Sequence, residues 1–235
     1  NKLREQARLQ HKSRQNGFKP YYETLEIEEG KGLNKLPKPS TNDIYLDFEG
    51  DRMVEPDGLE YMIGYFHKGS YHALWAKNEV EEKNIFEQFI DFAFKLNQED
   101  PTLHIYHYAP YEITSLRRLS TLHASREDKL DHLLRTRRFV DLFGVLRQAI
   151  QTSEPDLSLK TMEVFFTDGR SDEVTSAAQS IVEYKSWQTK GDQETLDGIL
   201  QYNKVDCENT EALRDWLLEL RAQYAGNLAW RTIGP

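Results

Sequence analysis

The order of strand-like and helix-like patterns along the chain restricts its fold more than any other feature. Residues 43–49 (DIYLDFE) alternate in character, with Ile44, Leu46 and Phe48 on one face of a predicted strand. Two aromatic-rich runs then flank Lys68-Gly69 and predict a hairpin beside that strand. These two runs are Leu59–His67 and Ser70–Trp75.

The rest of the chain alternates helical and strand patterns and closes on a long helix. The predicted helical segments are Glu79–Leu96, Tyr111–Leu122, Leu159–Phe166 (a turn or two) and Thr195–Tyr224, the last with Asp192 as a candidate cap. The predicted strands are Leu103–Tyr108 and Phe139–Phe143, the second of which runs into a helix. This order predicts an α/β domain with a mixed sheet.

Residues 1–40 differ in character from the rest of the chain. A polar, helix-prone stretch is succeeded by a segment punctuated by glycine and proline, so we interpret 1–40 as a helical or extended arm or linker. The compact domain is expected over 41–235. Because the first residue is Asn rather than Met, we expect the chain to be an excerpt from a longer protein.

The composition of the chain limits the cellular compartment and the binding partners that can be expected for it. No apolar run approaches the roughly 20 residues that a membrane span needs, and the single cysteine, Cys207, fits a reducing, cytoplasmic setting. The net charge of −9 argues against nucleic acid as a partner unless metal ions and local basic clusters offset it. Arg137 and Arg138 belong to such a cluster, although each could equally lie on a solvated helix face.

Three segments carry candidate site carboxylates, and in two of them hydrophobic periodicity predicts buried positions. Asp47 and Glu49 point to the same face of one strand, and a divalent cation is a natural partner for such a pair. Asp206 lies one helical turn after Tyr202 on the core-facing side of the last helix. Glu112 falls in the first turn of a helix, where the helix dipole alone would favour it. Solvent exposure of the strand pair and a salt bridge at Asp206 remain open alternatives.

These segments, in this order, resemble the three motifs of the DEDD exonuclease superfamily. Asp47-Phe48-Glu49 matches the first motif, and Tyr202 to Asp206 matches the third motif of the tyrosine subclass. Glu112 stands after Tyr111 where that superfamily usually has Asp, which puts its role as a ligand in doubt. The resemblance implies two divalent cations, Mg²⁺ or Mn²⁺, held by Asp47, Glu49, Glu112 and Asp206. It also implies that Tyr202 orients the attacking water in a 3′–5′ exonuclease.

A closer resemblance covers nearly the whole chain. Five segments are similar to the ribonuclease H-like domain of predicted RecB-type nuclease proteins. They are EQARLQ, LPKPSTNDIYLDFEGD, HYAPYEITSLRRL, FVDLFGVLRQA and YNKVDCENTEALRDWL. The resemblance implies a mixed five-stranded sheet flanked by helices. It also implies fusion to a further nuclease or helicase domain, and a DNA or RNA 3′ end as substrate.

Other residues receive more modest interpretations. Tyr108 and Tyr111 are the aromatic residues expected to stack on a base, and Lys160 could contact a phosphate or be an ordinary surface lysine. His104, His107 and Cys207 are read as structural, and Asp141 either as a residue near the site or as structural. The alternative to an exonuclease is a nucleic-acid-binding module that has lost catalysis, which the replacement of Asp by Glu112 keeps open.

Overall fold

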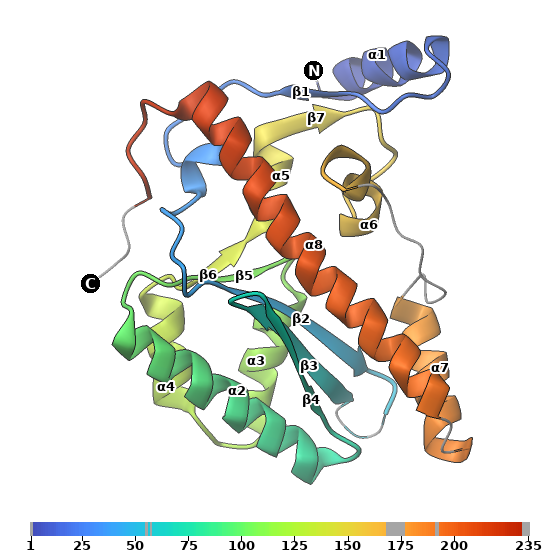
Figure 1. The fold of residues 1–235 in the computed structure, drawn as a ribbon, viewed down its shortest axis with the longest axis vertical. Coiled ribbons are helices and arrows are strands. Elements are labelled where there is room, and N and C mark those ends of the chain that lie inside the picture. Colours follow the sequence, from blue (N-terminus) through green and yellow to red (C-terminus); the bar gives the residue numbers. More distant parts are fainter. Residues whose placement is uncertain (1, 55, 57, 168–176, 191–192, 232–235) are drawn as a thin grey trace.

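A five-stranded mixed sheet forms the centre of the molecule (Figure 1). The computed structural model describes residues 2–54, 56, 58–167, 177–190 and 193–231. The strands lie in the order β4-β3-β2-β5-β6. Their bounds are β2 Ile44–Asp51, β3 Leu59–His67, β4 Ser70–Trp75, β5 Ile105–His107 and β6 Phe139–Asp141. The sheet confirms the predicted α/β class.

The first three strands form an antiparallel meander, and the last two run parallel to β2. The predicted hairpin around Lys68-Gly69 is therefore confirmed. In the β2–β3 ladder Asp47 lies opposite Gly64, and the register shifts between Glu49 and Gly50. Such a shift is a β-bulge, a feature that bends a strand and redirects its side chains.

One face of the sheet is covered by three helices. Ile44, Leu46 and Phe48 of β2 pack there in an apolar cluster with side chains from each of these helices. The helices are α2 Glu79–Glu99, α3 Tyr111–Leu122 and α4 Glu127–Arg135. Helix α2 begins where predicted, because Asn78 caps it by accepting a hydrogen bond from the amide of Glu81.

The other face carries α5 Leu142–Ala149 and the 33-residue α8 Gln193–Ala225, which crosses the sheet diagonally (Figure 1). Tyr45 of β2 packs in the apolar cluster on this face together with Leu213 and Trp216 of α8. Strand alternation therefore points Asp47 and Glu49 toward α8 as well. The long closing helix is confirmed, while the proposed cap Asp192 lies outside the described residues. An unpredicted helix, α7 Ala177–Lys190, packs against α8 and β2.

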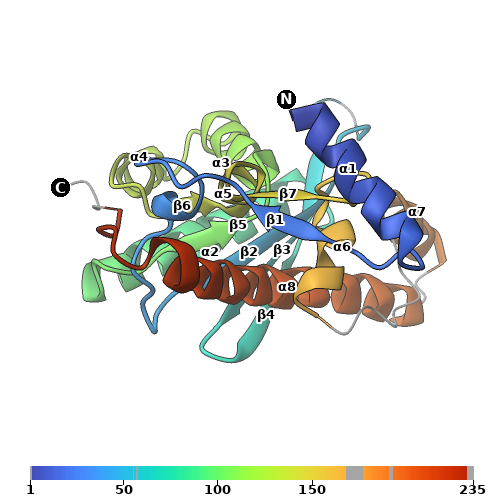
Figure 2. The ribbon, with the colours of Figure 1, turned by 90° about the horizontal axis from the view of Figure 1, so that it is seen from above.

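The first forty residues pack onto the α5 and α8 side. They contain α1 Lys2–Gln15, β1 Tyr22–Thr24 and the 3₁₀ helix η1 Gly32–Lys35. Strand β1 pairs with β7 Ile150–Thr152, and α1 packs beside β7 (Figure 2). Leu33 and Leu36 are buried against α5 and α8. Between β7 and α7 lie the short α6 Leu159–Met162 and η2 Glu163–Phe165. None of the helices in the described part of the chain has the length and apolar character needed to cross a membrane.

Candidate metal centre between strand β2 and helix α8

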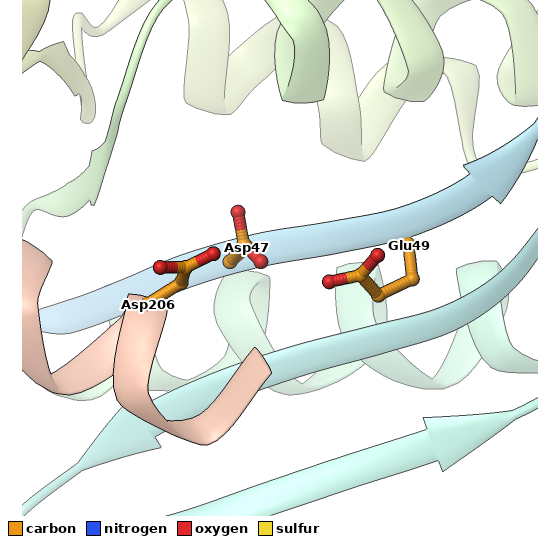
Figure 3. A group of neighbouring side chains, drawn as sticks. All are labelled: Asp47, Glu49 and Asp206. Carbon is orange, nitrogen blue, oxygen red and sulfur yellow. The ribbon is translucent and has the colours of Figure 1, made fainter. Parts of the chain in front are cut away.

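Three carboxylates meet where α8 crosses β2 (Figure 3). Asp47, Glu49 and Asp206 each offer one oxygen, and these oxygens all lie within 4.8 Å of one another. Glu49 and Asp206 are buried, whereas Asp47 is half-buried. The tertiary structure thus brings together three predicted site residues from separate segments of the sequence.

The electrostatics of this cluster favour a cation. Burial and, to a lesser degree, the negative charge of Asp206 together raise the pKa of Glu49 to about 8. Hydrogen bonds from neighbouring side chains offset only part of this effect. Carboxylate oxygens at this separation are the donors that hard divalent cations such as Mg²⁺ and Mn²⁺ prefer, so the donor set fits such an ion.

Asn203, one turn before Asp206 on α8, fixes the position of Asp47. Its side-chain amide donates to Oδ2 of Asp47 at 2.7 Å and to the backbone oxygen of Asp47 at 3.3 Å. Its Oδ1 accepts a hydrogen bond from the Tyr71 hydroxyl at 2.8 Å. Asn203 was not predicted as a site residue, although its spacing of three residues from Asp206 places it on the same helix face.

The close approach of Asn203 to the sheet depends on Gly64. A Cβ atom at Gly64 would lie 1.6 Å from Oδ1 of Asn203, a distance that no side chain could tolerate. Gly64 is the residue opposite Asp47 in the β2–β3 ladder. A glycine at this position in β3 is therefore what allows an α8 side chain to reach across β3 to Asp47.

Glu49 is held by a second chain of hydrogen bonds. The Ser180 hydroxyl on α7 donates to Oε2 of Glu49 at 2.9 Å and lies 2.8 Å from the Tyr61 hydroxyl. Because Ser180 has one hydroxyl proton and gives it to Glu49, Tyr61 must be the donor in the second bond. Nothing in the sequence around Ser180 pointed to this role, since helix α7 itself was not predicted.

Glu112 stands apart from the three-carboxylate group among the described residues. It is 3% exposed, and its Oε2 lies 3.6 Å from Nδ1 of His107. Burial raises the pKa of Glu112, which His107 partly counteracts and the nearby charge of Asp141 reinforces. The side chain of Asp141 itself accepts a hydrogen bond from the amide of Ala109 at 3.0 Å. The structure therefore places Glu112 in a neighbouring buried group with His107.

Two of the tyrosines that were predicted to contact nucleic acid form hydrogen bonds within the protein. The hydroxyl of Tyr108 donates to the backbone oxygen of Leu157, and that of Tyr111 donates to Oε2 of Glu60 at 2.8 Å. Arg138 is only 6% exposed, whereas Arg137 is exposed to solvent. Lys160 is exposed.

Tyr111 belongs to a buried network centred on Glu60 of β3. Oε1 of Glu60 accepts hydrogen bonds from Ser115 at 2.7 Å and from Arg118 at 3.2 Å. A Cβ atom on Gly50 would lie 2.0 Å from Oε2 of Glu60, so this network sits directly against the bulge that follows Glu49. The network joins that bulge to the first turn of α3, which carries Glu112.

Tyr202, which was predicted to orient the attacking water, is half-buried on α8 one turn before Asp206. Two further residues that were predicted to be structural are buried. Cys207 is a buried free thiol whose pKa is raised by burial, and His104 is fully buried. A thiol with a raised pKa carries little of the reactive thiolate.

Comparison with known proteins identifies the domain. A family model described as the RNase_H superfamily matches residues 44–218, a range that includes every strand of the five-stranded sheet and all three clustered carboxylates. Searches among curated proteins and solved structures give no match. Since the matched range covers most of the chain, the protein belongs to the RNase_H superfamily.

Proposed function

We propose that this domain is a metal-dependent 3′–5′ exonuclease that hydrolyses the phosphodiester bonds of DNA or RNA. The observation that carries the proposal is the convergence of Asp47, Glu49 and Asp206 within 4.8 Å, two of them buried. Membership of the RNase_H superfamily supports a nuclease. The 3′–5′ direction rests on the match of Tyr202 and Asp206 to the tyrosine-subclass motif.

In the proposed mechanism the carboxylates of Asp47, Glu49 and Asp206 hold two divalent cations, Mg²⁺ or Mn²⁺. When bound, such ions supply a water of lowered pKa and neutralise charge at the leaving 3′ oxygen. Asn203 and Ser180 keep Asp47 and Glu49 in place. Tyr202 orients the attacking water through its hydroxyl and does not take its proton, because a phenol is a poor general base at neutral pH. Glu112, at the start of α3, is the candidate fourth ligand.

A second function is favoured by the position of Glu112. Because Glu112 lies outside the 4.8 Å group and beside His107, the domain could instead bind nucleic acid without cleaving it. It would then present the strand to a fused nuclease or helicase. We propose such a fusion on the basis of the resemblance to RecB-type proteins. We propose a cytoplasmic location because the single cysteine suits a reducing compartment.

The deciding experiment incubates the protein with 3′-labelled single-stranded DNA and RNA in Mn²⁺, Mg²⁺ or EDTA. Release of nucleoside 5′-monophosphates only with metal would support the exonuclease, whereas retained binding without cleavage would support the binding module. Asp206→Asn should abolish cleavage, and Tyr202→Phe should lower it by about 10²–10⁴-fold. Asp197→Asn, an exposed site on the same helix, makes the same change of charge and should leave cleavage intact.

A further inference from the structure

A pocket lies at the β6 edge of the sheet, apart from the three carboxylates. Its volume is about 650 Å³, within the usual range of ligand sites. Its walls come from three segments that are distant in sequence: residues 29–35 before and within η1, residues 137–145 of β6 and α5, and residues 228–231 after α8. The segment after α8 runs beside η1 (Figure 1).

The charge of this pocket is opposite to that of the chain. Lys35, Arg137 and Arg231 line it together with the acidic Glu29 and Asp141, so it is net positive in a protein of net charge −9. A local excess of positive charge in an acidic chain favours an anionic ligand.

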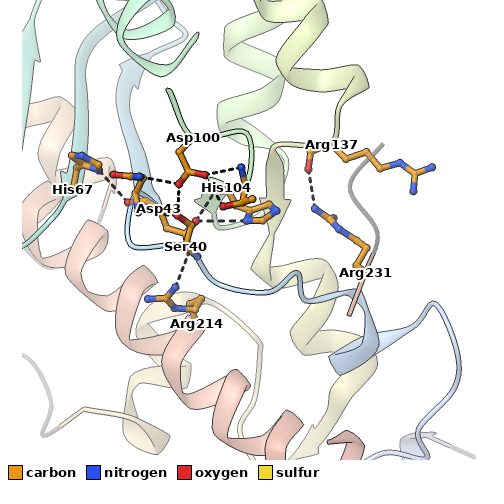
Figure 4. Close-up of polar contacts among 10 residues, drawn as sticks. Ser40, Asp43, His67, Asp100, His104, Arg137, Arg214 and Arg231 are labelled. Atoms are coloured by element: carbon orange, nitrogen blue, oxygen red, sulfur yellow. Dashed lines mark hydrogen bonds and ion pairs between the residues drawn. The ribbon is translucent and has the colours of Figure 1, made fainter. Parts of the chain in front are cut away.

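One arginine of the pocket has a guanidinium nitrogen without an acceptor. Nε of Arg231 is buried and has no hydrogen-bond partner in the described part of the chain. Nη2 of Arg231 donates to the backbone oxygen of Arg137 at 2.8 Å, which holds Arg231 against the strand segment that carries Arg137 (Figure 4). Buried donors without acceptors are costly unless a ligand or water supplies the acceptor.

An aromatic ring lies beside these charges. Trp230, on the pocket wall, is 38% exposed, and the guanidinium of Arg221 lies 3.6 Å from its ring centroid. Arg221 also donates to the backbone oxygens of Leu228 and Ala229, and the latter accepts from Asn34 as well. The segment carrying Trp230 is therefore anchored to both α8 and η1.

We propose that this pocket binds one nucleotide of a single-stranded nucleic acid at a distance from the carboxylates. Lys35, Arg137 and Arg231 contact the phosphate, and the base stacks on the exposed part of Trp230. Basic side chains next to an exposed aromatic ring are the recurring elements of single-strand binding. Val140 of this pocket packs in the same cluster as Tyr45, so the pocket lies on the α8 side of the sheet, as the carboxylates do. The proposal takes its ligand class from the proposed function.

The test measures binding of a fluorescently labelled oligothymidylate by anisotropy in EDTA, where metal-dependent cleavage cannot occur. The double variant Lys35→Gln/Arg137→Gln should weaken binding at least 10-fold. It should also lower the slope of log affinity against log salt by about 1.4, the effect of two lost phosphate contacts on a single strand. Arg135→Gln is the matched control, because its side chain is 80% exposed on α4 and does not line the pocket.

Stacking is tested separately at Trp230. Trp230→Ala should weaken binding by roughly 5- to 150-fold, and Trp230→Phe should restore most of the loss. The proposal would be overturned if the parent and the double variant bound the oligonucleotide equally well. It would also be overturned if polyglutamate displaced the labelled oligonucleotide at a lower concentration than unlabelled oligonucleotide does. Cleavage assays on the same variants separate the two hypotheses. Binding that depends on the pocket residues, without any cleavage, would contradict the exonuclease proposal and support the pocket proposal. Cleavage together with binding that does not depend on the pocket residues would support the exonuclease and contradict the pocket proposal.

Discussion

The side-chain amide of Asn203 donates to Oδ2 of Asp47 at 2.7 Å, which joins helix α8 to strand β2 directly beside the three carboxylates. The same amide group accepts from Tyr71 on β4, so one buried side chain connects α8 with two strands of the sheet. Because Asp206 lies three residues further along α8, this contact also sets the distance between Asp206 and Asp47.

Replacement of Asn203 by Ala should loosen Asp47 and weaken metal binding. Residues that hydrogen-bond metal ligands typically contribute about 10–100-fold to metal affinity, and a similar loss of Mn²⁺ affinity is expected by calorimetry. The free energy of unfolding should fall by about 1–3 kcal/mol, because the Tyr71 hydroxyl loses its acceptor. Gln201→Ala, on the exposed side of α8, is the control. An Mn²⁺ affinity equal to that of the parent would show that Asn203 has only a structural role.

Gly64→Ala should be destabilising because the added Cβ would lie 1.6 Å from Oδ1 of Asn203. Overpacking of this kind typically costs about 1–3 kcal/mol, which thermal unfolding would detect. The double variant Gly64→Ala/Asn203→Ala removes the clashing amide, so it should be more stable than the sum of the two single effects predicts. Strictly additive losses would mean that Gly64 serves some purpose other than admitting Asn203.

The stability of the metal-free protein should fall as the pH rises from about 5 to about 8. The folded protein holds a proton on Glu49, with a pKa of about 8, that the unfolded chain releases near the ordinary value of 4.5. Its contribution is therefore complete below the unfolded pKa and disappears as the pH rises through the folded pKa. The melting temperature in EDTA should be lower at pH 8 than at pH 5.5.

Mn²⁺ should raise the melting temperature more at pH 8 than at pH 5.5, because protons compete with the cation for the carboxylates. Glu49→Gln should reduce both the pH dependence in EDTA and the response to Mn²⁺. If the parent and Glu49→Gln gave parallel curves across this range, the assignment of the pH dependence to Glu49 would be wrong.

Tyr111→Phe should cost more stability than Tyr108→Phe. The Tyr111 hydroxyl bonds the buried carboxylate of Glu60, whereas that of Tyr108 bonds the neutral backbone oxygen of Leu157. Hydrogen bonds to charged groups contribute about 1.5–3 kcal/mol and those between neutral groups about 1 kcal/mol, a difference that chemical denaturation resolves. Tyr111 also precedes Glu112, so Tyr111→Phe should lower metal-dependent cleavage. Equal losses of stability in the two variants would show that the hydrogen bond to Glu60 is no stronger than the one to Leu157.

The sequence by itself predicted the five strands of the main sheet, most helices and the three carboxylates that cluster. These features follow from local periodicity: Asp47 and Glu49 interrupt an apolar alternation, and Asp206 interrupts the apolar stripe of a long amphipathic helix. A carboxylate at a position that should be buried is a signal that a single segment can carry, because its desolvation must be compensated somewhere in the fold.

Only the tertiary structure decided which side chains support these carboxylates and where the remaining candidates lie. Asn203, Ser180 and Gly64 act across α8, α7 and β3, and contacts between distant elements leave no periodic trace in any one of them. The same reason explains Glu112, whose place beside His107 rather than among the other carboxylates depends on how α3 packs against the sheet. Local sequence specifies the face of an element, but packing specifies the partner on that face.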